Sequence, residues 1–81
     1  MSIATAEITE SIDARGMACP GPLLALIGAI RRSATDSVFE VLSSDEGSKT
    51  DIPAWVAKAR HELVEVIPED GYARFVVRKT H

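Results

Sequence analysis

Apolar residues along the first half of the chain change from an alternating to a helical spacing. Residues 8–13 are an expected strand, in which Ile8 and Ile12 share one face. Residues 20–33 are an expected helix, because apolar side chains recur there every three or four positions. This stripe consists of Leu23, Ile27 and Ile30, widened by Leu24 and Leu26. The two arginines that follow suit the negative end of a helix dipole.

The second half of the chain repeats the alternation. Residues 38–42 are mostly β-branched or aromatic, which is typical of a central strand. A polar loop over 43–49 precedes a second expected helix, which Asp51 caps and which holds Pro53 in its first turn. The apolar stripe of this helix consists of Ile52, Val56 and Ala59, and Leu63 continues it as the helix ends.

Two strands close the chain, over 63–67 and 72–78, and Asp70-Gly71 between them is a strong hairpin signal. On the last strand, one face carries Ala73, Phe75 and Val77, and the other carries Arg74 and Arg78. The element order is therefore βαβαββ. It predicts a two-layer α/β sandwich, a four-stranded mixed sheet with two helices on one face.

Length and charge narrow the function classes. With 81 residues the chain is one small domain over 1–81, and 46% hydrophobic with 26% charged residues is an ordinary globular composition. The net charge of −3 argues against direct binding of nucleic acid, which needs clustered cations. Residues 17–30 are uncharged but too short, and too rich in Pro and Gly, to span a membrane. Residues 1–10 lack the features of a signal peptide, so we expect a cytoplasmic protein.

Cys19 is the only cysteine. A single cysteine excludes an intramolecular disulfide, a Cys-x-x-Cys redox pair and a Cys-rich zinc site. The low cysteine content also favours a reducing compartment. His61 and His81 have no partners that indicate a metal or a catalytic dyad. We therefore expect no metal and no cofactor.

The chemistry is concentrated in residues 13–22, where Cys19 stands at the start of a helix. A helix N-terminus can lower the pKa of a thiol through its dipole and its unpaired N–H groups. Pro20 and Pro22 stiffen this approach and lack N–H groups, which leaves Gly21 and Leu23 as donors.

Small residues surround the thiol in the sequence, namely Gly16, Ala18 and Gly21. They leave room for a large partner to approach the sulfur. The alternative is that Cys19 is a buried, inert thiol, as single cysteines in small domains often are. Two interpretations of Asp13 and Arg15 stay open. In the first, Asp13 is a turn residue at the end of the strand and Arg15 is a solvated cation. In the second, Arg15 attracts an anionic sulfur group.

Residues 12–22 resemble the Cys-Pro-x-Pro signature of the TusA/SirA/YeeD family of small sulfur carrier proteins. Residues 50–55, residues 61–64 and the closing strand are similar to the same family. The resemblance implies the sandwich of the C-terminal domain of a bacterial translation initiation factor. It also implies that Cys19 carries sulfur as a persulfide or thiosulfonate, with little turnover by the chain alone. The supporting residues are then Asp13, Arg15, Gly16, Pro20, Gly21 and Pro22.

The resemblance further implies transient partners, a rhodanese-like or DsrE-like donor sulfurtransferase and an acceptor protein. Some relatives that serve tRNA 2-thiouridine formation have a second cysteine where this chain reads Ala54-Trp55-Val56. Its absence removes one mark of that subgroup. Cys-Pro-Gly-Pro with Pro-Ala-Trp resembles members associated with dissimilatory sulfur oxidation, so the resemblance implies sulfur oxidation or sulfur trafficking, and tRNA thiolation is the alternative. Two other classes stay open, a non-catalytic regulatory or interaction module and a thiol redox protein. The latter would need an external resolving thiol.

Overall fold

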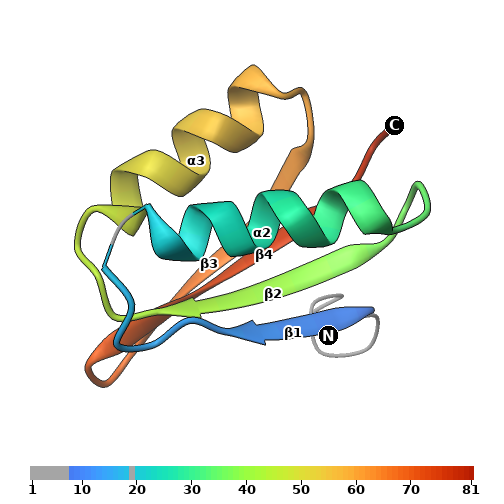
Figure 1. The fold of residues 1–81 in the computed structure, drawn as a ribbon. Coiled ribbons are helices and arrows are strands. Elements are labelled where there is room, and N and C mark those ends of the chain that lie inside the picture. The colour runs from blue at the N-terminus through green and yellow to red at the C-terminus, as the bar shows by residue number, and fades with distance from the viewer. Residues whose placement is uncertain (1–7, 19) are drawn as a thin grey trace.

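Two helices cover one face of a four-stranded sheet and leave its other face open (Figure 1). The computed structural model describes residues 8–18 and 20–81. In chain order the elements are β1 (Glu10–Asp13), α2 (Gly21–Arg32), β2 (Val38–Ser43), α3 (Ser48–Lys58), β3 (Glu62–Glu69) and β4 (Tyr72–Arg78). The predicted βαβαββ order and two-layer sandwich are confirmed. Neither helix is long and apolar enough to cross a bilayer, and no other helix occurs in these residues.

The strands lie in the order β1-β2-β4-β3. β1 pairs with β2 in parallel, whereas β4 is antiparallel to both β2 and β3. The carboxyl ends of β1 and β2 therefore meet at one end of the sheet. The predicted hairpin is confirmed, since Glu69 pairs with Tyr72 and Gly71 supplies a φ of 84° in the turn between them.

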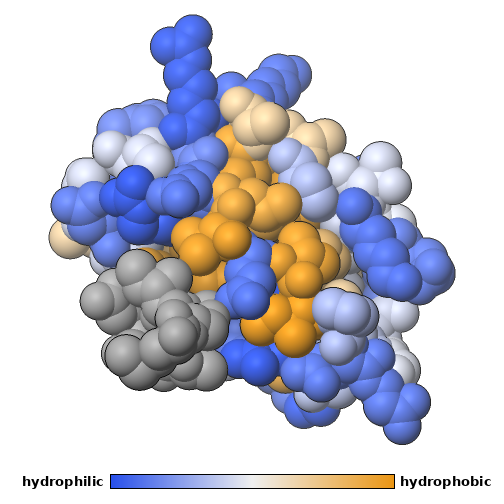
Figure 2. Space-filling model, turned by 180° about the vertical axis from the view of Figure 1, so that it is seen from behind, coloured by the Kyte–Doolittle hydropathy of each residue, from blue (hydrophilic) through white to orange (hydrophobic). Residues whose placement is uncertain are grey.

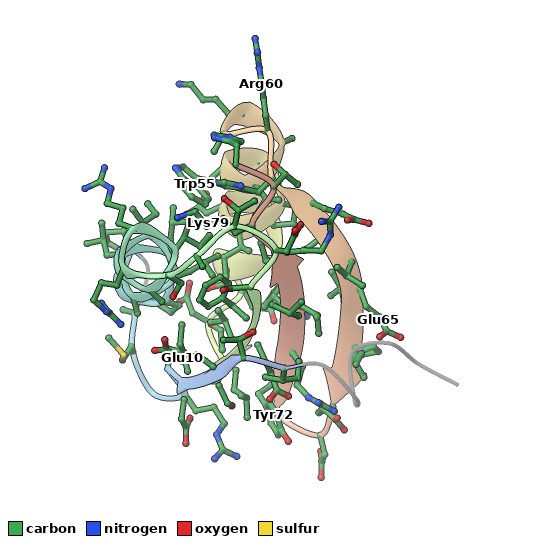
Figure 3. All side chains as sticks on the ribbon, turned by 90° about the vertical axis from the view of Figure 1, so that its right-hand side faces the viewer. Glu10, Trp55, Arg60, Glu65, Tyr72 and Lys79 are labelled. Carbon is green, nitrogen blue, oxygen red and sulfur yellow. The ribbon has the colours of Figure 1, made fainter. Side chains whose placement is uncertain are left out.

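The main core lies between the helices and the sheet. The face of β4 that was predicted to be apolar, Ala73, Phe75 and Val77, is buried there. Phe39 from β2 and Leu26 from α2 join it with no exposed surface. Trp55 packs against this cluster from the helix side of the sheet, whereas Glu65 projects from the opposite side (Figure 3).

The buried stripe of α2 differs from the predicted one. It is centred on Leu26 and consists of Pro22, Leu26, Ala29 and Ile30. Ile27 is only half-buried, and Leu24 is 59% exposed. Leu24 is two positions from Leu26, which is about 200° around a helix of 3.6 residues per turn. It therefore points to solvent when Leu26 points to the core.

The second helix starts earlier than expected. Gly47 is its N-cap residue, so Asp51 lies inside the first turn and does not cap it. The start is held at Ser48, whose buried hydroxyl accepts a hydrogen bond of 2.8 Å from the Ser43 hydroxyl. Pro53 consequently lies inside the helix, where it removes one backbone donor.

Ile8 and Ile12 lie on opposite faces of the sheet, contrary to the prediction. Ile12 packs against the main core and Ile8 against the second cluster. Regular pairing begins only at Glu10, because Thr9 binds Val38 twice. Its N–H donates to the Val38 carbonyl over 2.7 Å, and its hydroxyl accepts the Val38 N–H over 3.0 Å. This irregular residue breaks the alternation between the two isoleucines.

The face of the sheet away from the helices carries an apolar patch (Figure 2). It contains buried Val38 and Val76, with partly buried Ile8, Val64 and Ile67 packed against them. Charged side chains on the same face are paired. Arg74 forms an ion pair with Glu40, and Arg78 forms ion pairs of 2.7 Å with both Asp36 and Glu62.

The last residues of the chain fasten the ends of both helices. The Lys79 ammonium donates to the carbonyls of Ile30 at 2.8 Å and Ser33 at 2.6 Å, at the end of α2. Thr80 N–H donates to Nδ1 of His61 over 3.2 Å, and the His61 ring stacks on His81 with centroids 4.6 Å apart. This cap on α2 adds to the predicted effect of Arg31 and Arg32.

The position of Leu26 predicts a large loss of stability for Leu26→Ala. We expect the free energy of unfolding to fall by about 2–5 kcal/mol, because the substitution leaves a cavity in the core. Leu24→Ala is the matched control on the same helix and should cost less than about 1 kcal/mol, since Leu24 is exposed. Urea unfolding of both variants measures the difference. Equal losses would contradict the observed orientation of α2.

His61 predicts a dependence of stability on pH. Burial first, and then the charges of His81 and Lys79, lower the pKa of His61 below its usual value of about 6.5. The unfolded chain therefore binds the proton more readily, and stability should decrease as the pH falls below about 6.5. His61→Gln should flatten this decrease in urea unfolding between neutral and mildly acidic pH. His81→Gln should preserve most of it, because burial is the larger cause. An unchanged slope in His61→Gln would refute the assignment.

Candidate functional site

The loop between β1 and α2 is fastened to the end of β2. Ala14 is fully buried, and its N–H donates to the Leu42 carbonyl over 2.9 Å. Met17 N–H donates to the Ala14 carbonyl over 3.2 Å and closes a turn in which Gly16 has a φ of 85°. Only glycine adopts this φ without strain, which explains Gly16 at this position. The Gly16 N–H in turn donates to the Ser44 hydroxyl over 2.9 Å.

Cys19 itself lies outside the described residues, so its exposure and the state of its thiol stay predictions. Its chain neighbours Ala18 and Pro20 are both exposed. Pro20 is the N-cap residue of α2, and Pro22 is buried in the first turn of this helix. The predicted helix start directly after the cysteine is thus confirmed.

One of the two expected helix donors is already used. The Gly21 N–H donates to the Ala18 carbonyl over 2.8 Å. An anion at this helix start would therefore depend on Leu23 and on the dipole of α2 more than the sequence indicated. The first turn contains no acidic residue that would oppose a negative charge there.

Two large apolar side chains are exposed beside this loop. Met17 is 44% exposed in the loop, and Leu24 is 59% exposed on the first turns of α2. Gly21 lies beneath Met17, because a Cβ atom at Gly21 would come within 3.1 Å of the Met17 methyl group. Together with exposed Pro20, they form an apolar rim that we call the loop rim: Met17, Pro20 and Leu24. Exposed apolar groups that gather at one place favour contact with a partner protein.

Asp13 and Arg15 form an ion pair at the start of the loop. The Arg15 guanidinium donates to both carboxylate oxygens, from Nε at 2.9 Å and from Nη2 at 2.8 Å. The side-chain hydrogen bond from Arg15 lowers the pKa of the Asp13 carboxyl to about 2. The guanidinium also lies over the Tyr72 ring, 4.9 Å from its centroid. The charge of Arg15 is thus compensated, and its attraction for an anionic sulfur group stays a prediction.

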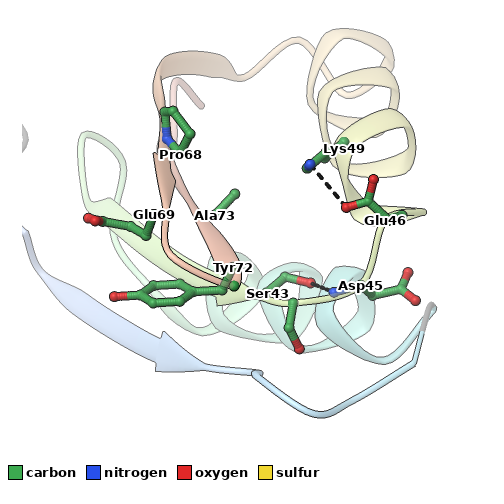
Figure 4. A pocket seen from close by; sticks show the side chains of 10 residues that line it. Ser43, Asp45, Glu46, Lys49, Pro68, Glu69, Tyr72 and Ala73 are labelled. Atoms are coloured by element: carbon green, nitrogen blue, oxygen red, sulfur yellow. Dashed lines mark hydrogen bonds and ion pairs between the residues drawn. The ribbon is translucent and has the colours of Figure 1, made fainter.

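A cavity of about 300 Å³ lies between the loop that joins β2 to α3 and the β3–β4 hairpin (Figure 4). One wall contains Lys49, which forms an ion pair of 3.0 Å with Glu46, and the facing wall contains Pro68 and Ala73. Asp45 also lines it, and its Oδ2 atom is buried with no hydrogen-bond partner in the described part of the chain. Within the polar loop expected over 43–49, Glu46 is exposed, whereas Asp45 is partly buried.

Sequence reasoning missed Ser44 and Tyr72. Both contact the loop from distant parts of the chain, Ser44 through Gly16 and Tyr72 through Arg15. Ser44 lies in a polar run without a distinguishing spacing, and Tyr72 was assigned only to a strand. The strand order places both residues at the end of the sheet where the loop lies, so a prediction of that order would have identified them. Within residues 8–18 and 20–81, no group of three or more His, Cys, Asp or Glu side chains could hold a metal ion.

Comparison with known proteins places these features in a family. A family profile described as "Sulfurtransferase TusA" matches residues 10–79. An Archaeoglobus fulgidus protein named as a candidate sulfur carrier is 56% identical over 68 residues, covering 84% of this chain and 93% of its own length. The sulfur carrier protein TusA of Pseudomonas aeruginosa is 32% identical over 75 residues, covering 93% of this chain and 95% of its own.

The fold has a counterpart among solved structures. The crystal structure of a SirA-like protein from Desulfitobacterium hafniense superimposes with a TM-score of 0.79 at 20% identity, covering 89% of this chain and 99% of that one. Its likeness supports the fold, and the sequence matches support the family. On the match over residues 10–79 and the curated relatives, this chain belongs to the TusA family.

Proposed function

We propose that this protein carries sulfur on Cys19 as a persulfide, which it takes from a donor sulfurtransferase and passes to an acceptor protein. One observation carries the proposal. The only thiol of the chain stands in the Cys-Pro-x-Pro motif of the TusA family, between two exposed residues, Ala18 and Pro20. A thiol with this role must be reached twice, once for loading and once for delivery.

The transfer needs no oxidant. The thiolate of Cys19 attacks the outer sulfur of a persulfide on the donor, so that a new S–S bond forms on Cys19. The S–S bond of the donor breaks, and the donor leaves as a thiolate. Delivery repeats the step, with a thiolate of the acceptor as the attacking group and Cys19 as the leaving group. The alternative cargo is a thiosulfonate, received from a donor that already holds it.

The absence of a second cysteine favours a stable loaded state. No other thiol of the chain can attack the persulfide, so it cannot collapse into an internal disulfide. The sulfur should stay on Cys19 until a partner arrives, and the chain alone should show little turnover. A thiol redox protein would instead need a resolving thiol.

The loop rim is suited to transient docking of these partners. Met17 and Leu24 would lose solvent contact when a partner covers the loop, which favours association. A few central apolar residues often account for most of the affinity of such a surface. We propose a place in sulfur oxidation or sulfur trafficking, because Cys-Pro-Gly-Pro with Pro-Ala-Trp resembles relatives of that kind and Ala54-Trp55-Val56 lacks the second cysteine of some tRNA-thiolating relatives.

Cys19→Ser tests the assignment directly. After treatment with polysulfide, the parent protein should gain the mass of one sulfur atom, and Cys19→Ser should gain none. A thiosulfonate would add the mass of the sulfonate oxygens as well. Intact-protein mass spectrometry under non-reducing conditions makes the measurement. Equal loading of both proteins, or a parent thiol that resists alkylation in the folded state, would refute the proposal.

Leu24→Ser tests the loop rim. Its rate of sulfur transfer from a rhodanese-type sulfurtransferase should fall about tenfold, because a partner loses an apolar contact. Loading by polysulfide, which needs no docking, should stay unchanged. Val66→Ser is the matched control, since Val66 is 42% exposed on β3 and outside the rim. Equal effects of the two substitutions on the protein donor would contradict a docking role for Leu24.

A further inference from the structure

Three side chains at the end of the sheet form a continuous contact that we call the loop brace: Asp13, Arg15 and Tyr72. Two guanidinium nitrogens of Arg15 donate hydrogen bonds to the Asp13 carboxylate. The Arg15 backbone N–H donates a third hydrogen bond of 3.2 Å to Oδ1 of Asp13. The same guanidinium lies 4.9 Å from the centroid of the Tyr72 ring. Tyr72 is the first residue of β4, so the brace joins the loop to the β3–β4 hairpin.

The brace lies away from the helices. Asp13 alternates with Ile12, which packs on the main core, and Tyr72 alternates with Ala73, which is buried in that core. Alternate residues of a strand point to opposite faces of a sheet. Both partners of Arg15 therefore belong to the open face, whereas α2 and its N-terminus lie on the other.

The rest of the loop is held mainly through its backbone. Gly16 has no side chain and Ala18 has only a methyl group. The Gly16 N–H donates to the Ser44 hydroxyl, the Met17 N–H donates to the Ala14 carbonyl, and the Ala18 carbonyl accepts from the Gly21 N–H. Each residue of such a segment loses conformational entropy when it is ordered. A bidentate guanidinium stacked on a ring is a rigid, directional contact, in contrast to the point charge of an ammonium group.

We propose that Arg15 and Tyr72 are positioning residues, which hold the loop so that the sulfur on Cys19 is presented to a partner protein. Arg15 acts through the backbone of residues 15–18. This inference rests on the proposed carrier function. It assigns to Tyr72, at a distant place in the chain, a part in sulfur transfer.

Loss of the brace should disturb the loop locally and leave the fold intact. The side chains of Arg15 and Asp13 are 47% and 58% exposed, and exposed ion pairs contribute little to global stability. Reactions that need docking of two proteins depend strongly on orientation, whereas a small reagent reaches a mobile thiol as easily as a fixed one. The two kinds of reaction therefore separate positioning from folding.

The experiment compares Tyr72→Leu with Tyr72→Phe, which keeps the ring face under Arg15. Tyr72→Leu should slow sulfur transfer from a thiosulfate-loaded rhodanese about tenfold, and Tyr72→Phe should keep the parent rate. In both variants the rate of alkylation by iodoacetamide should change less than about twofold. The thermal midpoint of both should shift by no more than a few degrees. Parent-like transfer by Tyr72→Leu, or an equal loss in Tyr72→Phe, would overturn the proposal.

Substitutions of Arg15 and Asp13 separate positioning from attraction of an anionic sulfur. Arg15→Lys keeps the charge but loses the bidentate and stacked geometry, so positioning predicts slow transfer and attraction predicts the parent rate. Asp13→Asn frees the charge of Arg15, so positioning predicts slower transfer and attraction predicts faster transfer. Parent-like or faster rates in these two variants would overturn the proposal.

A readout independent of sulfur loading distinguishes failure of the brace from failure of the carrier function. The ¹⁵N order parameters of the Gly16, Met17 and Ala18 amides should fall in Tyr72→Leu and stay at parent values in Tyr72→Phe. If the parent takes no sulfur from the rhodanese or from polysulfide, the carrier function fails, whereas unchanged order parameters in Tyr72→Leu refute the brace itself.

Discussion

The parallel pairing of β1 with β2 is the constraint on which the site depends. Because both strands run in one direction, the loops that leave them emerge at the same end of the sheet. The loop before α2 can then rest on the loop before α3, and the hydrogen bond from Gly16 to Ser44 joins them. The buried hydroxyl pair of Ser43 and Ser48 fixes the second loop to its helix. A shift in the register of β1 would move the cysteine loop away from all of these supports.

The residues that stabilise the fold differ from those to which the proposed function assigns contact with partners. The main core between the helices and the sheet contains Phe39, Phe75 and Leu26, and of the described loop residues 14–18 and 20 only Ala14 belongs to it. The loop between β1 and α2 contains small residues and a proline beside two large side chains, Arg15 and Met17. Met17 in this loop and Leu24 on α2 are exposed outside the core. A relay protein gains from this division, because the loop can change its contacts without changing the fold.

Local patterns in the sequence predicted the elements and the motif well. Three confirmed predictions depend on residues close together in the chain. They are the apolar face of β4, the Asp70-Gly71 turn and the start of α2 after Cys19. The predictions were wrong or incomplete where contacts between distant parts of the chain determine which side chains are buried or paired. Periodicity alone could not tell that Leu24 faces solvent, since a stripe can be centred on several neighbouring residues. The contact of Arg15 with Tyr72 depends on strand order, which no local pattern contains.

The irregular edge of the sheet at β3 has a consequence for how other chains can approach. The pairing of β3 with β4 shifts register between Leu63 and Glu65, and Pro68 lacks an N–H group near the end of the strand. Glu62 and Glu69 add charge along the same strand. Bulges, prolines and charges on an outer strand disfavour the addition of a further strand from another molecule. Crowded copies of this protein are thereby kept from joining their sheets into fibrils through β3.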